Sequence, residues 1–421
     1  MKKFIALFIS LCFILLCFSG CGKKSAENGR VYYLNFKPEQ DAAWQQLAKT
    51  YQEKTGVQVD VVTASQGKYE ETLTAAIDKT NAPTLFQISG VTALDAWRDY
   101  CLDLKDTAVY KALTSEDFAL KEGEKVYGVA YVYEGYGLIV NKSLLKKAGY
   151  DVSDVKDFQS LKLIAESIHS RAKELGFDAF TSSTLDSASS WRFTGHLANI
   201  PLFYEFRDDN ILSQPKVIKG TYLDRFKNLW DLYVNNATIE PSKITSAVDA
   251  AKEFAAKKAV FYQNGTWAYD DVKAVGDENL DYIPIYAGVD DEKQGLCCGT
   301  ENYWAVNSLS SEEDIKATLD FLEWVVTSEE GTTALANDMG FVSPFKKAKP
   351  VSNVLANKMN EYVKDGRYNV SWAFSFTPNV EQWRGDLVSS LSAYTTGTGN
   401  WDAVKDAFVN GWERQYNASH S

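Results

Sequence analysis

Histidine is scarce in this sequence: the 421 residues include only His169, His196 and His420. So few histidines argue against a histidine-rich metal site and against a Ser-His-Asp triad. The GxSxG, HExxH, P-loop and GxGxxG motifs and paired CxxC motifs are also missing from the sequence. We therefore predict that the protein is not an enzyme, has no catalytic residues, and needs neither a metal nor another cofactor.

Positive charge is in short supply. The 44 Lys and Arg residues face 56 Asp and Glu residues, so the formal net charge is −12. Nucleic-acid binding needs basic patches, and we expect no nucleic-acid partner. The adjacent acidic pairs Asp208-Asp209, Asp270-Asp271 and Asp290-Asp291 have no EF-hand spacing, and neighbouring side chains point apart. We interpret them as solvated loops rather than as glycosidase or Ca²⁺ sites.

The N-terminus reads as a processing segment. Residues 1–20 contain two lysines followed by an apolar run, which is typical of a secretory signal peptide. The run is marginal for a membrane span. Phe18-Ser19-Gly20-Cys21 resembles a bacterial lipobox, so we predict that Cys21 becomes the lipidated N-terminus and that 21–30 is a flexible tether. The alternative is a cleaved signal peptide followed by an unrelated cysteine.

Cysteine is too sparse for a disulfide framework. Once residues 1–20 are removed, Cys21, Cys101, Cys297 and Cys298 remain. A bridge between the adjacent Cys297 and Cys298 would be strained. With Cys21 lipidated, we expect the other cysteines to be buried free thiols.

The body of the chain alternates between strand and helix patterns. Residues 31–36, 57–61 and 83–88 read as strands, and 41–56 and about 68–80 as helices. This order predicts a parallel sheet covered by helices, with ligands at the C-terminal strand ends. Those ends carry the first candidate binding residues: Lys37, Glu39, Gln66 and Ser89.

Two extended segments interrupt this alternation, at 126–141 and 299–307. We expect them to cross between two lobes, with a third crossing near 341–345. The rest of the chain is rich in helical patterns.

Three stretches carry a family resemblance: 137–150, with an NKxLxxxAG-type strand-to-helix element; 259–268, with a GxW loop; and 319–331, an FLxxL-type helix ending in SxEG. With the lipobox, they resemble the maltose-binding-protein-like family of extracellular solute-binding lipoproteins, which serve carbohydrate ABC importers. The resemblance implies a two-lobed α/β fold of the type II periplasmic-binding-protein class. We expect mostly parallel sheets flanked by helices, with hinge crossovers. We assign 31–133 and 303–341 to lobe 1, and 134–302 and 342–417 to lobe 2.

The resemblance also implies site residues. Trp267 occupies the position of the family's sugar-stacking tryptophan. Glu134 falls where the family has a ligand-contacting glutamate on a hinge strand. Trp191 and Trp383 lie near positions of cleft aromatics.

Tryptophan is abundant, with 11 residues, and most of its positions fall into two groups. Those at helical spacing with other apolar residues are expected in the core: Trp44, Trp97, Trp230, Trp324 and Trp412. Trp304 lies in a strand and is expected to be structural. Those among Ser, Gly, Thr, Asn and Pro are expected in loops, where ligands bind more often: Trp191, Trp267, Trp372 and Trp383. Gly265 would let the backbone turn sharply and aim Trp267 into a cleft.

We predict a monomeric binding protein held at the extracellular face of the membrane by a lipid on Cys21. It would capture oligosaccharides, including those of the malto-oligosaccharide type, and deliver them to an ABC permease. The remaining candidate ligand contacts are Asn264, Asp186 and Glu301. One alternative is a non-sugar solute in the same fold, such as a polyamine, an amino-acid derivative or a metal chelate; a cationic ligand would use Glu39, Glu134 and Glu301. The other is an extracellular glycan-cleaving lipoprotein.

Overall fold

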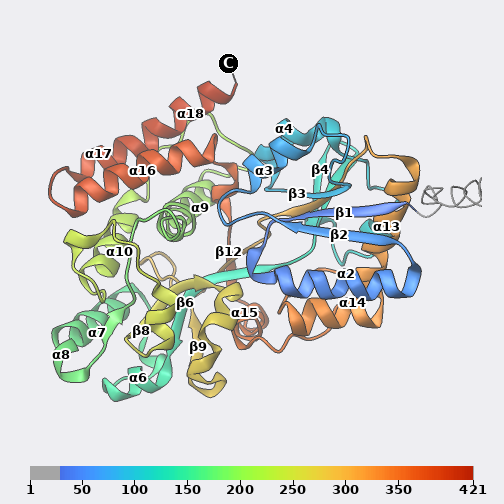
Figure 1. Cartoon of the computed structure of the whole chain (residues 1–421). Coiled ribbons are helices and arrows are strands. Elements are labelled where there is room, and N and C mark those ends of the chain that lie inside the picture. Colours follow the sequence, from blue (N-terminus) through green and yellow to red (C-terminus); the bar gives the residue numbers. More distant parts are fainter. Residues whose placement is uncertain (1–28, 421) are drawn as a thin grey trace, which may run out of the picture.

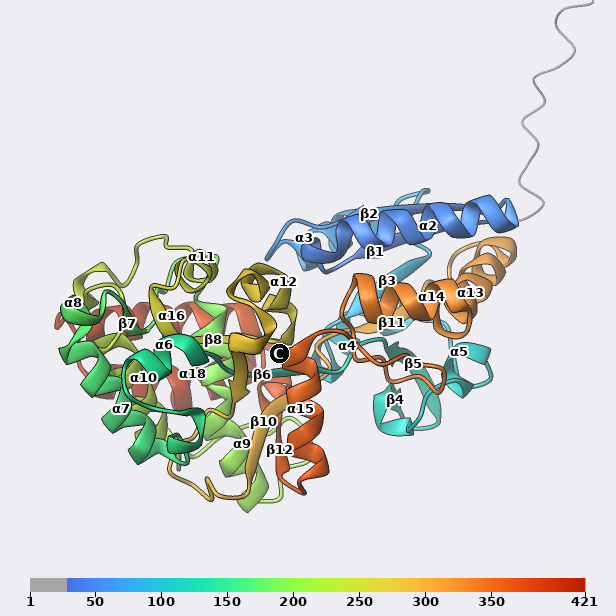
Figure 2. The same ribbon diagram turned by 90° about the horizontal axis from the view of Figure 1, so that it is seen from below.

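The structure, a computed structural model, describes residues 29–420. The predicted signal peptide, Cys21 and most of the tether lie outside the described residues. Two β-sheets, each flanked by helices, form two lobes joined by extended chain segments (Figures 1 and 2).

The first lobe is built on a six-stranded sheet in the order β2-β1-β3-β11-β5-β4. Its strands are β1 (Arg30–Asn35), β2 (Gln58–Thr63), β3 (Leu85–Ile88), β4 (Ala119–Glu122), β5 (Lys125–Ala130) and β11 (Tyr303–Val306). Its helices are α2 (Asp41–Thr55), α3 (Tyr69–Ala76), α4 (Val91–Trp97), α5 (Ala108–Lys111), α13 (Glu312–Thr327) and α14 (Glu329–Thr333).

The second lobe has a sheet in the order β12-β10-β6-β8-β7, with β9 also paired to β6. Its strands are β6 (Glu134–Asn141), β7 (Asp178–Phe180), β8 (Ala259–Gly265), β9 (Leu280–Ile283), β10 (Gln294–Gly299) and β12 (Tyr368–Ser371). Its helices are α6 (Lys142–Lys147), α7 (Phe158–Ser170), α8 (Ala172–Leu175), α9 (Asn199–Asp208), α10 (Leu223–Asn235), α11 (Ala250–Ala255), α12 (Tyr269–Val272), α15 (Val354–Lys364), α16 (Val380–Thr395), α17 (Trp401–Lys405) and α18 (Gly411–Ser419).

The local sequence explains why the elements close to the binding site described below adopt their structure. Helix α2 buries one apolar stripe, and its C-cap Gly56 has φ 74°, a left-handed conformation that favours glycine. The Gly56 N–H donates to the Gln52 carbonyl oxygen and closes the last turn. This helix and the strands on either side of it lie where the sequence pattern predicts them. The stripe consists of Trp44, Leu47, Ala48 and Tyr51.

The sheets are mixed, so the expectation of mostly parallel sheets is wrong. Strand β1 is parallel to β2 and β3, as the strand–helix alternation predicts, but β11 is antiparallel to both β3 and β5. In the second sheet, β6 is antiparallel to β8, β9 and β10. Apart from the β4–β5 hairpin, every antiparallel pair includes β6 or β11. These are the strands that the chain enters directly from the other lobe, from β5 to β6 and from β10 to β11. These two passages are the crossings predicted at 126–141 and 299–307.

The third crossing lies later than expected. Phe345 belongs to the core of the first lobe and forms a β-bridge with Leu113. The Lys346 N–H then donates to the Ala112 carbonyl oxygen over 2.9 Å, whereas α15 packs on β9 and β10 of the second lobe. Lys349 still donates to Glu329 and Thr333 on α14. The chain thus leaves the first lobe after Lys349 rather than at 341, because the buried Phe345 ring holds it there.

The large side chains expected in the core are found there. Trp44, Trp230, Trp304 and Trp412 are fully buried, and Trp97 nearly so. Trp324 packs at the margin of the first core. The prediction of free thiols is confirmed, with Cys297 and Cys298 buried and Cys101 partly so. Within residues 29–420, no helix has the length and apolar character of a membrane span.

Candidate binding site

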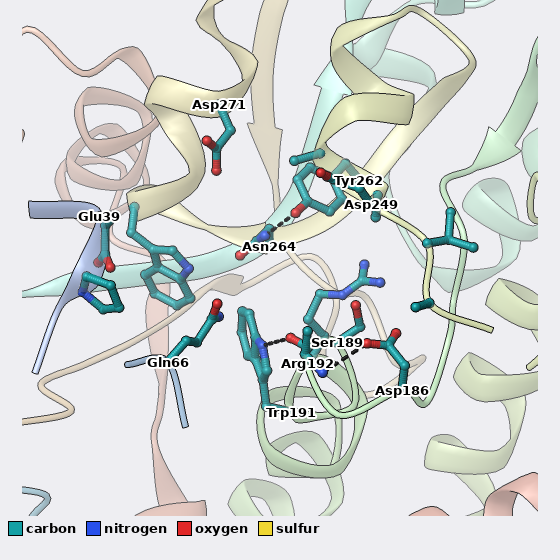
Figure 3. A pocket seen from close by; sticks show the side chains of 17 residues that line it. Glu39, Gln66, Asp186, Ser189, Trp191, Arg192, Asp249, Tyr262, Asn264 and Asp271 are labelled. Atoms are coloured by element: carbon teal, nitrogen blue, oxygen red, sulfur yellow. Dashed lines mark hydrogen bonds between the residues drawn. The ribbon is translucent and has the colours of Figure 1, made fainter. Parts of the chain in front are cut away.

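A cavity of about 540 Å³ opens between the two lobes (Figure 3). The first lobe contributes Pro38, Glu39 and Gln66. The second lobe contributes Asp186, Ala188, Ser189, Trp191, Arg192, Ala247, Val248, Asp249, Ala250, Ala251, Tyr262, Asn264, Trp267 and Asp271. The two walls therefore differ: the first lobe provides a short polar edge, and the second provides the rings and most of the charge.

The loop before Trp191 holds this ring at the cavity wall. The Asp186 carboxylate accepts hydrogen bonds from the Ala188 N–H and the Thr184 hydroxyl, and each bond is 2.9 Å long. The Trp191 indole N–H donates to the Ala188 carbonyl oxygen over 2.8 Å (Figure 3). With its N–H satisfied inside the loop, the half-buried indole contributes mainly its face to the cavity.

Trp267 lies in a short 3₁₀ turn directly after β8. Gly265, which precedes this turn, has φ −97° and ψ 177°, an extended conformation open to any residue. The expected sharp turn is therefore not the reason for glycine here. A Cβ at this position would lie 2.2 Å from the indole of Trp267, so glycine is needed because the ring folds back over it.

The two tryptophans belong to one aromatic cluster behind the cavity. The ring centroids of Trp191 and Trp267 are 6.0 Å apart, and both rings contact Tyr136. His196 stacks on Tyr136 with 4.0 Å between centroids and contacts both indoles. Burial, with Arg384 and Lys37 nearby, lowers the pKa of His196 to about 3, so the imidazole is a neutral ring in this stack.

A buried ion pair lies beside the same cluster and joins the lobes. The Lys37 ammonium, in the loop after β1, is 2.9 Å from the Glu134 carboxylate on β6, with side chains 4% and 2% exposed. It also lies 5.6 Å from the centroid of Trp267, within cation–π range. Asn35 fixes the loop by accepting from the Lys37 N–H and donating to its carbonyl oxygen.

Carboxylates outnumber cations around this pair. Lys37 is also 3.7 Å from Glu39. Burial opposes the charge on Lys37, yet Glu134, Glu39 and Glu301 outweigh it and raise the pKa of Lys37. Burial raises the pKa of Glu301 to about 7, although Lys37 acts against the shift. The base of the cleft therefore holds a permanently charged lysine among three acids.

The structure reveals cavity residues that sequence reasoning missed. The Arg192 side chain is 3% exposed and lies 5.6 Å over Tyr262, and its Nη2 donates to the Ser182 carbonyl oxygen. Tyr262 accepts a hydrogen bond from the Asn264 amide (Figure 3). Arg192 adjoins Trp191, and Tyr262 shares with Asn264 one face of β8. Their closeness to predicted site residues was a signal in the sequence that could have identified Arg192 and Tyr262.

Of the residues predicted to bind ligand, one group lines the cavity: Trp191, Trp267, Asn264, Glu39, Gln66 and Asp186. A second group lies behind the lining. Lys37 and Glu134 form the buried pair, Glu301 interacts with them, and Trp372 is 6% exposed and packs edge-on against Trp267.

Two predicted site residues lie elsewhere. Trp383 is on α16 rather than in a loop, is 1% exposed, and packs against Phe408 and Trp412. Its indole N–H donates to the Phe408 carbonyl oxygen. It is a core residue, and the prediction of a stacking role is wrong. Ser89 donates to Glu70 over 3.3 Å at the end of β3 and does not line the cavity.

The site shows no metal-binding arrangement. Within the described part of the chain, no three His, Cys, Asp or Glu side chains converge in a way that could hold an ion. The cavity instead combines aromatic faces with carboxylate, amide, hydroxyl and guanidinium groups, which suits a polar organic ligand.

The comparisons with known proteins identify the family. The sequence profile of the bacterial extracellular solute-binding proteins matches residues 46–363. The chain belongs to this family. No curated protein sequence matches it significantly.

Solved structures of solute-binding proteins share the fold. RafE in complex with raffinose has 17% identity and a TM-score of 0.72, and the match covers 92% of this chain and 99% of that one. The GacH receptor of Streptomyces glaucescens, solved unliganded and with acarbose, has 19% identity and a TM-score of 0.71. The match covers 93% of this chain and 99% of that one. A chitin oligosaccharide binding protein has 15% identity and a TM-score of 0.68, and the match covers 92% of this chain and 98% of that one. The two-lobed α/β fold is thereby confirmed.

Proposed function

We propose that this extracellular solute-binding protein captures oligosaccharides for an ABC importer. The observation that carries the proposal is the pair of half-buried indoles, Trp191 and Trp267, at the wall of an interlobe cavity with polar groups around it. A sugar ring presents C–H faces and hydroxyl edges. Aromatic faces cover the first, and carboxylates, amides and guanidinium groups bind the second. Related folds solved with raffinose and acarbose support the same ligand class.

The magnitudes are adequate for this role. Covering one indole face, about 80 Å², contributes roughly 2 kcal/mol at about 25 cal/mol per Å². A micromolar Kd corresponds to about 8 kcal/mol. Two rings and a few hydrogen bonds to Asn264, Asp186 and Gln66 reach that range after the costs of association.

The ligand would be enclosed by hinge closure. Three extended passages join the lobes, and the cavity takes residues from both. Direct contacts between the lobes include the Lys37–Glu134 pair and the bond from the Thr92 hydroxyl to the Ser375 carbonyl oxygen. Hinge motion about such passages is a known mode of closure around ligands. Solution scattering should show a smaller radius of gyration with saturating ligand, and an unchanged radius would contradict closure.

The lipid anchor on Cys21 is a separate part of the proposal. Cys21→Ala should remove the protein from the membrane fraction when it is expressed with its own signal peptide. Processed protein that stays in the membrane would contradict lipidation at this residue.

Calorimetry with mature protein and a panel of neutral and charged oligosaccharides tests the binding function. We expect micromolar or tighter binding of at least one oligosaccharide, without release of reducing sugar. Binding of spermidine or an amino acid, with no sugar bound, would favour the non-sugar alternative. Cleavage of the panel would favour the glycan-cleaving alternative.

A further inference from the structure

We infer that the oligosaccharide recognised by this cavity carries a protonated amine, held between Asp271 and Glu39 beside the Trp267 ring. The inference rests on the proposed function and narrows it to amine-bearing sugars.

The first observation is the sign of the charge on the cavity wall. Four carboxylates line the cavity, and one guanidinium opposes them. The positive group, on Arg192, is already bonded to the Ser182 carbonyl oxygen and covers Tyr262. Sugar hydroxyls can also donate to carboxylates, but an excess of negative charge on the wall favours a ligand that carries positive charge. The carboxylates are Glu39, Asp186, Asp249 and Asp271.

The second observation separates the four acids by their partners. Asp186 is bonded within its own loop, and Asp249 caps α11 and pairs with Lys252. Asp271 has no hydrogen bond or ion pair to any of the residues that the structure describes. Burial, followed by repulsion from Asp249, Asp270 and Glu39, raises the pKa of Asp271. A cation beside Asp271 would relieve that repulsion.

The third observation concerns the base of the cleft. The charge of Lys37 is committed to Glu134 at 2.9 Å, and Glu39 is more distant at 3.7 Å. Even so, the Oε2 atom of Glu134 is buried without a hydrogen-bond partner in the described part of the chain. One ammonium balances one carboxylate, so Lys37 neutralises only one of the two charges of Glu134 and Glu39.

Geometry brings these features to one end of the cavity. In Figure 3, Glu39 and Asp271 both lie on the side of the cavity opposite Asp186, with Asn264 and Trp191 between, and the charge of Glu39 acts on Asp271. An amine at this end would meet two carboxylates, and an adjoining sugar face would cover an indole. An aromatic face beside carboxylates favours a cation over a neutral group.

The test is a glycan array read at pH 6, where an amine with a pKa of about 8 is protonated. It carries α- and β-linked oligosaccharides in matched neutral, N-acetylated and free-amine forms, with spermidine measured separately by calorimetry. An amine about 6 Å from two carboxylates in water gains about tenfold in affinity. We expect at least that preference for free-amine members in 50 mM salt and a smaller preference in 500 mM salt.

Two variants test whether Asp271 produces the preference for free-amine oligosaccharides. Asp271→Asn should reduce the ratio of free-amine to neutral affinity about threefold or more, because it removes one of the two charges. Asp270→Asn is the matched control, since Asp270 pairs with Lys273 and does not line the cavity. This control should leave the ratio unchanged.

The outcomes are distinguishable. Equal or tighter binding of neutral or N-acetylated members overturns the amine inference and leaves the oligosaccharide function standing. An amine preference that survives Asp271→Asn overturns the assigned site. No binding to any array member, with or without spermidine binding, overturns both the inference and the proposed function.

Discussion

Two regions of the second lobe are rich in tryptophan, and they use it differently. Beside the cavity, Trp191 and Trp267 are half-buried and stand 6.0 Å apart next to open volume. In the layer formed by α16 and α18, Trp383 and Trp412 meet edge-to-face at 6.1 Å and are almost completely buried. The residue type is the same in both regions, so tryptophan alone does not mark a binding site. Partial burial beside a cavity does.

The regions also differ in their polar neighbours. The indole N–H groups of Trp383 and Trp412 donate to backbone carbonyl oxygens of Phe408 and Pro215 within a packed layer. Trp267 instead has the buried Lys37–Glu134 pair behind it. We therefore expect the helical layer to contribute mainly to the stability of the fold. We expect the cavity region to contribute mainly to ligand affinity, and its buried charges to contribute part of the stability. Four substitutions separate these roles.

The largest expected effect is that of Trp383→Ala. Removing a fully buried indole from the helical layer should cost about 3–5 kcal/mol in the free energy of unfolding. Affinity for an oligosaccharide found in the panel should remain within about twofold. Chemical denaturation and calorimetry measure the two quantities, with the exposed neighbour Gln382→Ala as control. A large loss of affinity in a folded Trp383→Ala protein would restore this residue to the site.

Lys37→Met comes next, because it leaves Glu134 charged, buried and without its partner. Breaking a buried ion pair in this way costs about 3 kcal/mol or more. Lys54→Met is the matched control, since Lys54 pairs with Glu330 at the surface and should cost at most about 1 kcal/mol. Adding Glu134→Leu to Lys37→Met should recover much of the loss. Equal effects of the two lysine substitutions would show that the Lys37–Glu134 pair is not structural.

Trp267→Ala should show the reverse of Trp383→Ala. Losing one covered sugar face weakens binding by roughly 2 kcal/mol, or about 30-fold in Kd. The ring is only half-buried, so the loss of stability should be clearly smaller than for Trp383→Ala. Titration calorimetry and thermal melting of both proteins give the comparison. Normal affinity together with a collapsed melting temperature would place Trp267 in the core.

The smallest effect is a pH dependence from Glu301. Burial raises its pKa to about 7, from an ordinary value of 4.5. The folded protein therefore holds this proton more tightly than the unfolded chain, and stability from this group falls as pH rises from about 4.5 to 7. Glu301→Gln should leave stability at pH 5 nearly unchanged and raise it by about 1–2 kcal/mol at pH 8, after allowance for partial solvent exposure.

The measurement is the free energy of unfolding of the wild type and of Glu301→Gln as a function of pH. The difference between the two profiles isolates Glu301, because His196 acts in the opposite direction at lower pH in both proteins. Buried in its neutral form, His196 destabilises the fold only as pH falls below about 6.5. Parallel profiles for the two proteins between pH 5 and 8 would show that Glu301 does not titrate in this range.

Local sequence determined the elements and the general order of the fold. Helix α2 has its apolar stripe and its terminal Gly56 in four consecutive turns, so its limits follow from short-range spacing. The two extended segments that cross between lobes were visible as long β-rich runs, because a strand pattern needs no distant partner to be recognised. The family resemblance likewise rested on three short stretches. They led to Trp267, which lines the cavity.

Tertiary structure decided what each element faces. Trp383 follows a Pro-Asn turn, as a loop residue would, but α16 turns it inward against Phe408. Strand direction in the mixed sheets depended on how the chain crosses between lobes. Asp271 looked like one of several solvated acids, and only the approach of the first lobe placed Glu39 on the wall of the same cavity. Burial, partner choice and charge balance arise between residues far apart in the chain, so short-range patterns do not encode them.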